Sequence, residues 1–179
     1  MTRTVGLVSA LALASVPAGC ASPASAPVAT PPAAALAASP PRVVLPPLPD
    51  IPLPADAPKP GEWTTWSRDQ KMTYMKGSFM TAERAIFASW EPVRFKEITC
   101  HHCHGPGVID GTFRLPNPDL PRLAPGADGF RELLAHEPEV LAFMQKRVVP
   151  ETARLLGMAP FDMETHTGFS CYQCHVRQG

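Results

Sequence analysis

One five-residue pattern occurs twice in this chain: a cysteine, two variable residues, a second cysteine and a histidine. The two copies occupy residues 100–104 and 171–175, and the only other cysteine is Cys20. Two thiols three positions apart lie within one helical turn, with the histidine directly after them. The fold must therefore serve two separate groups, each of two thiols and one imidazole.

The pattern C-x-x-C-H is the signature of c-type haem attachment. Each thiol can add to one vinyl group of the same haem, and the adjacent histidine can then supply the proximal nitrogen to the iron. The sequence predicts two covalently bound c-type haems, the first held by Cys100, Cys103 and His104 and the second by Cys171, Cys174 and His175.

Three other uses of paired cysteines compete with haem attachment. The four thiols could form two disulfides, bind structural zinc or act in thiol–disulfide exchange. However, 67 residues separate Cys103 from Cys171, and no βαβ pattern surrounds either pair. None of these alternatives predicts a histidine directly after each second cysteine.

The N-terminus indicates export. Residues 5–16 form an apolar run that is too short for a stable membrane span and fits a signal peptide over residues 1–19. Cys20 follows Pro17-Ala-Gly, which resembles a bacterial lipobox, although Pro17 stands where an aliphatic residue is usual. The alternative is an ordinary signal peptide with an incidental cysteine. We expect a lipid anchor on Cys20 and a periplasmic protein, and Ala21 favours the outer membrane.

A proline-rich stretch follows the signal. Fourteen of the 23 prolines lie between Pro17 and Pro60. Proline fixes φ and removes a backbone donor, so we expect residues 20–61 to form a semi-rigid spacer that does not fold alone. Residues 62–179 have a globular composition. The formal net charge of zero argues against nucleic-acid binding, which needs a basic surplus.

The folded region is predicted to be all-α. Ser67 and Gln70 form a capping box, apolar residues then recur at helical spacing over 72–90, and no segment has a strand pattern. Pro92 predicts the start of another helix that runs into the first cysteine pair. The remaining segments are a loop over 105–128 and further helical spacing over 130–134 and 140–156, where Pro150 kinks or restarts the helix.

An internal repeat appears when the sequence is shifted by 69 residues. Tyr74-Met75 then aligns with Phe143-Met144, while Cys100 falls two residues short of Cys171. Each half is therefore a helix, a link and a cysteine motif.

The second axial ligand of each iron is predicted from this repeat. The second motif ends four residues before the C-terminus, so its ligand must come from upstream. Met75 and Met144 occupy equivalent places 25 and 27 residues before their motifs. A methionine at helical spacing also commonly fills a core. The alternative ligands are Met80, Met158 and His136.

Helices with candidate methionine ligands ahead of each motif resemble the multihaem cytochrome subunit of photosynthetic reaction centres. That subunit carries four haems and is a lipoprotein in some bacteria. The resemblance covers about residues 70–179, and two motifs correspond to half of such a unit. The segments 115–121 and 168–175 also resemble a family of small bacterial cytochrome c lipoproteins.

These features predict a periplasm-facing dihaem electron carrier that exchanges electrons with redox proteins of the cell envelope. It would not be an enzyme, and no small-molecule substrate is indicated. One alternative is a small dihaem peroxidase or reductase, which needs an iron without a sixth protein ligand. Another is a non-haem zinc or disulfide protein of the envelope.

Overall fold

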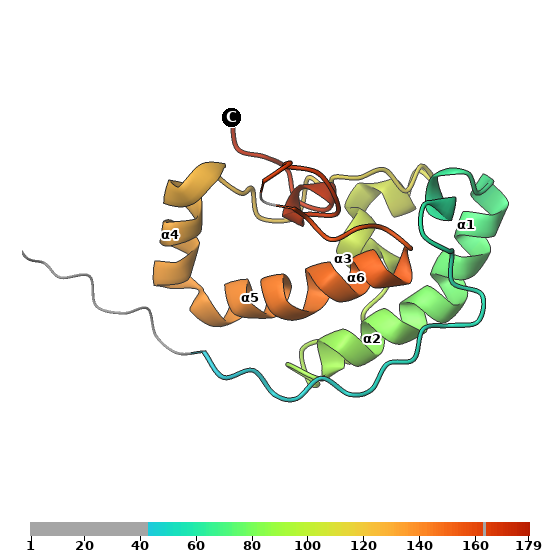
Figure 1. Ribbon diagram of the computed structural model, residues 1–179, viewed down its shortest axis with the longest axis horizontal. Helices are drawn as coiled ribbons and strands as arrows, with labels where there is room; N and C mark the ends of the chain where they lie inside the picture. The colour runs from blue at the N-terminus through green and yellow to red at the C-terminus, as the bar shows by residue number, and fades with distance from the viewer. Residues whose placement is uncertain (1–42, 163) are drawn as a thin grey trace, which may run out of the picture. The chain divides into compact units, whose positions relative to one another are not determined.

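The computed structural model describes residues 43–162 and 164–179, so the predicted signal peptide 1–19 and Cys20 lie outside the described residues. Within the described part, the chain forms helices joined by loops and contains only isolated β-bridges in place of strands (Figure 1). The all-α prediction is confirmed. None of the helices in these ranges combines the length and hydropathy that a bilayer span requires.

The first long helix consists of α1 (Arg68–Tyr74), a π turn (Met75–Phe79) and α2 (Met80–Ala88). It begins at the predicted capping box. The backbone N–H of Gln70 donates to the Ser67 hydroxyl, and the Gln70 side chain accepts from the Ser67 N–H. The helix therefore starts where the sequence predicts.

The second long helix repeats this construction with α5 (Pro138–Phe143), a π turn (Met144–Val148) and α6 (Val149–Leu155). Pro150 stands in the first turn of α6 and restarts the helix, because its missing N–H cannot continue the regular hydrogen-bond pattern. The other elements are η1 (Glu62–Thr64), α3 (Cys100–His104), η3 (Gly105–Val108), α4 (Gly126–His136) and η5 (Cys171–Gln173).

The two long helices run in opposite directions and pack against each other (Figure 1). The ring centroid of Phe143 lies 4.4 Å from that of Trp90 and 5.5 Å from that of Phe87. The Tyr74 hydroxyl donates a buried 2.7 Å hydrogen bond to the Leu155 carbonyl. Aromatic contacts and this hydrogen bond fix the crossing of the helices.

The structure reproduces the 69-residue repeat. The two π turns begin at Met75 and Met144, which are equivalent in the sequence shift. Glu83 and Thr152 have the same separation, and the Thr152 hydroxyl donates a 2.7 Å hydrogen bond to the Glu83 carboxyl. Equivalent residues of two antiparallel helices can meet only near a two-fold axis, so the approximate axis of the repeat passes between these two side chains.

The helix predicted from Pro92 is wrong. Residues 92–97 form turns, and α3 begins only at Cys100. The Phe95 ring lies 5.0 Å from the Phe87 ring and 6.0 Å from the Trp90 ring. These contacts turn the segment back over the end of α2, so burial of one aromatic ring overrides the helix-starting tendency of proline.

Residues 43–61 differ from the free spacer that we expected, because they pack along the folded unit. Arg154 donates a 2.8 Å hydrogen bond to the Ile51 carbonyl, and Gly61 donates to the Gly157 carbonyl. An extended proline-rich chain has three residues per turn, so apolar residues at that spacing share one side. Those that pack against the core at this spacing are Leu45, Leu48 and Ile51.

Candidate functional site

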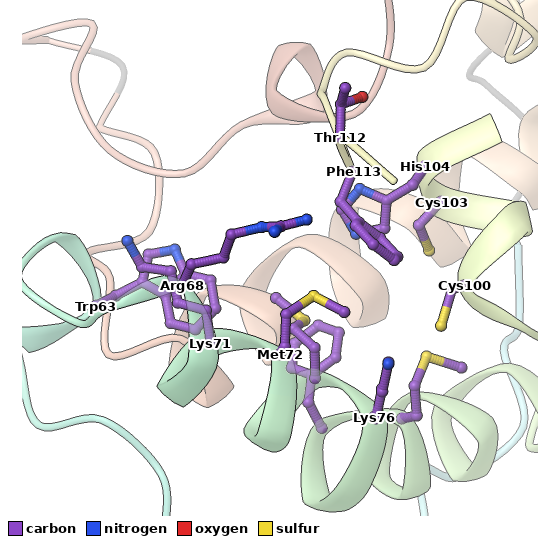
Figure 2. Close-up of a pocket in the computed structure, with 13 residues that line it drawn as sticks. Trp63, Arg68, Lys71, Met72, Lys76, Cys100, Cys103, His104, Thr112 and Phe113 are labelled. Carbon is purple, nitrogen blue, oxygen red and sulfur yellow. The ribbon is translucent and has the colours of Figure 1, made fainter. Parts of the chain in front are cut away.

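The first cysteine motif forms a short helix with its own cap. The Thr99 N–H donates to Nδ1 of His102 at 3.0 Å, so the third residue of the motif closes its N-terminus. One helical turn separates Cys100 from Cys103. Both thiols border one cavity (Figure 2), as attachment to a single group requires.

A cavity of about 310 Å³ lies between α3 and the first long helix. This volume is within the range of pockets that bind cofactors. In Figure 2, His104 and Phe113 stand on one side of the cavity, across from Met72 and Trp63. The remaining lining residues include two further thioethers and three cations, namely Met75, Met80, Arg68, Lys71 and Lys76.

His104 presents a neutral imidazole to this cavity. Burial lowers the pKa of His104, with the backbone of the following loop partly opposing the shift. Its Nδ1 is buried without a hydrogen-bond partner among the described residues, and its ring stands edge-on to Phe113 at 5.6 Å. A neutral imidazole is the form that binds a metal.

The second cysteines of the two motifs are desolvated. Burial, assisted by the charge of Glu83, raises the pKa of Cys103 to about 12 and that of Cys174 to about 11. Neither thiol is therefore a reactive thiolate at neutral pH. In the structure, Cys100, Cys103, Cys171 and Cys174 are unpaired. Within residues 43–162 and 164–179, no group of three or more His, Cys, Asp or Glu side chains is arranged to hold a metal ion.

The second motif has the same local design. Ser170 and Gln173 form its capping box, and the His175 N–H donates to the Cys171 carbonyl. Nδ1 of His175 lies 2.9 Å from the Pro121 carbonyl oxygen. A carbonyl can only accept, so Nδ1 carries the proton and the other ring nitrogen is free. Metal-binding histidines are commonly oriented in this way.

The loop between the motifs holds them together through Asn117, which is 2 % exposed. Its backbone N–H donates to the Cys174 carbonyl at 2.9 Å, and its side-chain amide donates to the His102 carbonyl at 3.4 Å. Gly105 approaches it so closely that an added Cβ would lie 2.1 Å from Asn117 Oδ1. One buried amide therefore contacts both cysteine motifs.

The predicted methionine ligands have different surroundings in the two halves. Met75 and Met80 both line the first cavity, and Met144 is half-buried against the core. Met158 also packs against the core, whereas His136 is exposed at the end of α4. Which of these side chains bind iron stays a prediction.

Several residues of the site escaped sequence analysis. Met72 lines the first cavity, and its position three residues before Met75 on one helix was the available signal. Glu83 and Thr152 could have been noticed because their separation equals the repeat. No local pattern pointed to Asn117 or Pro121, because their partners are remote in sequence.

Comparisons of the chain with protein-family models, with curated protein sequences and with solved structures find no match.

Proposed function

We propose that this chain is a dihaem c-type cytochrome that carries electrons between redox proteins of the cell envelope. The observation that carries the proposal is the first cavity. It brings together two thiols one helical turn apart, a neutral imidazole and methionine thioethers. A c-type haem needs these donors, and when bound it supplies one-electron redox chemistry at its iron.

The cysteines and histidines have separate tasks in this proposal. Cys100 and Cys103 tether the first group covalently, and His104 binds its iron. In the second half, Cys171 and Cys174 are the tethers. His175 is the iron ligand, and the Pro121 carbonyl holds its ring in the required tautomer.

Methionine thioethers are proposed as the second axial ligands. Met75 and Met144 stand at the start of matching π turns, and such wide turns are frequent at functional sites. A shared distortion at equivalent positions favours a shared task. Met72 and Met80 line the same cavity as Met75, so they are the rivals in the first half. Met/His ligation raises a haem potential.

The charge of the first cavity suits an anionic cofactor. Arg68, Lys71 and Lys76 line it, and no aspartate or glutamate is among its lining residues. A haem carries two propionate carboxylates, which pair well with guanidinium and ammonium groups. The apolar lining residues would exclude water from the rest of the group.

Export and anchoring complete the proposal. A signal peptide over residues 1–19 and a lipid on Cys20 would place the protein at the periplasmic side of a bacterial membrane. Residues 43–61 lie along the folded unit, which leaves residues 20–42 as the free part of the tether.

The experiment is expression of the full chain in a bacterial host that matures c-type cytochromes, followed by a pyridine haemochrome spectrum and an intact mass. We expect two haems per chain. Paired replacement of Cys100 and Cys103 by serine should remove one haem, and paired replacement of Cys171 and Cys174 should remove the other.

A colourless protein whose thiols are free, bridged or zinc-bound would refute the proposal. Rapid turnover of peroxide by the mature protein would instead support the enzymatic alternative.

A further inference from the structure

Glu83 is a buried carboxyl without a counterion. It is 3 % exposed, and its hydrogen-bond partner is the Thr152 hydroxyl at 2.7 Å. In residues 43–162 and 164–179, no lysine, arginine or histidine forms an ion pair with it. Burial of an unpaired carboxylate is costly, and such groups often mark functional sites.

The position of Glu83 relates it to both halves of the molecule. It lies at the approximate two-fold axis, where its partner is the equivalent residue of the other repeat. After the main effect of burial, its charge is the next cause that raises the pKa of Cys103 and of Cys174. One carboxyl is therefore within electrostatic reach of both cysteine motifs.

We propose that Glu83 is a redox-linked proton acceptor shared by the two haem sites. This inference rests on the proposed function. When one electron arrives from a donor protein of the envelope, the positive charge at an iron falls by one. Glu83 then takes one proton from solvent, and it releases that proton when the electron leaves. Thr152 occupies Oε1, so Oε2 receives the proton, and each step leaves the net charge unchanged.

The state of Glu83 near neutral pH supports this assignment. Burial raises its pKa to about 7, and the hydrogen bond from Thr152 opposes the rise. A carboxyl with this pKa is poised between its two forms, so a change of one charge nearby can decide which form is present.

The other titratable groups around Glu83 are unsuited to this task. Glu151 of α6 is paired with Arg154 at 2.6 Å. Tyr74 of α1 has its pKa raised to about 12, chiefly by burial. Cys103 of α3 and Cys174 beside η5 would be thioethers in the mature protein and would not titrate.

The test is a potentiometric titration of the mature dihaem protein from roughly pH 5 to pH 9, the range on either side of the Glu83 transition. In the natural protein, the midpoint potential of at least one haem should fall as the pH rises through neutrality. Glu83→Gln keeps the shape and the acceptor for Thr152 but cannot ionise, so this slope should disappear. Glu151→Gln is the matched control and should keep it.

Infrared difference spectra provide an independent readout. The reduced-minus-oxidised spectrum of the natural protein should contain the C=O stretch of a protonated carboxyl, and this band should be absent from Glu83→Gln. If Glu83→Gln fails to mature, Thr152→Val serves instead. Loss of the hydroxyl donor should raise the carboxyl pKa and move the sloping region to higher pH.

Equal slopes in the natural protein and Glu83→Gln would overturn the inference, because another group would then carry the proton. Unchanged behaviour of Thr152→Val would overturn it as well. A natural protein with two haems and no slope defeats only this inference, whereas a natural protein without haem defeats the proposed function.

Discussion

Gly105→Ala should be strongly destabilising, because two costs coincide at this residue. Gly105 has φ +51° and ψ −132°, a region nearly restricted to glycine, and forcing alanine into it costs about 1–3 kcal/mol. The new Cβ would lie 2.1 Å from Oδ1 of buried Asn117. If Asn117 moves, its hydrogen bonds to His102 and Asp119 are lost, at about 1–3 kcal/mol for a buried polar group. The total loss is about 2–6 kcal/mol.

The assay is urea denaturation of the mature protein, followed by far-ultraviolet circular dichroism. The midpoint should fall while the m-value stays constant. Gly61→Ala is the control, because Gly61 also has a positive φ of +81° but has no atom within 4 Å of the added Cβ. It should cost only about 1–2 kcal/mol.

A second comparison isolates the contact with Asn117. In an Asn117→Ala background, the oxygen that meets the new Cβ is gone, so Gly105→Ala should cost only its backbone part. The reasoning fails if Gly105→Ala costs no more than Gly61→Ala, or if Asn117→Ala leaves its cost unchanged.

Three further predictions concern stability and potential. Tyr74→Phe should lower the free energy of unfolding by about 1–3 kcal/mol, because the buried Leu155 carbonyl loses its donor; Tyr172→Phe, whose bond to Ala124 is longer at 3.2 Å and part-buried, should cost less in the same denaturation assay. The raised pKa of Glu83, about 7 against an ordinary 4.5, means that the folded state binds its proton more tightly. Stability from this group is therefore full below pH 4.5 and is lost as the pH rises through about 7, by about 3 kcal/mol in all; a difference between the natural protein and Glu83→Gln that stays constant over that range would contradict this. Met75→Ala and Met144→Ala should each lower the midpoint potential of one haem, whereas Met72→Ala should leave both nearly unchanged; the opposite result would make Met72 a ligand.

The sequence predicted those parts of the fold that depend on neighbours in the chain. The start of α1 was readable because Ser67 and Gln70 cap the same turn. The repeat was readable because equivalent residues keep a constant separation. Both signals are local or periodic, and the structure contains both features.

Other parts depended on contacts that no local pattern encodes. Pro92 suggested a helix, but the packing of Phe95 against Phe87 decided the path of the chain. The segment 43–61 read as a spacer by composition, and its apolar residues at three-residue spacing were the overlooked signal for docking. In the site, the cysteines and histidines were evident from their motifs. Asn117 was not, because both carbonyls that it meets belong to distant residues.

The meeting of Glu83 and Thr152 shows what covalent fusion of two similar units makes possible. In a dimer of identical subunits, a residue on the symmetry axis faces its own copy. Two glutamates there would repel each other or compete for one proton, and two threonines would provide no ionisable group. Once both units belong to one polypeptide, their sequences can diverge at this point. One unit then contributes the acid and the other contributes the hydroxyl that holds it.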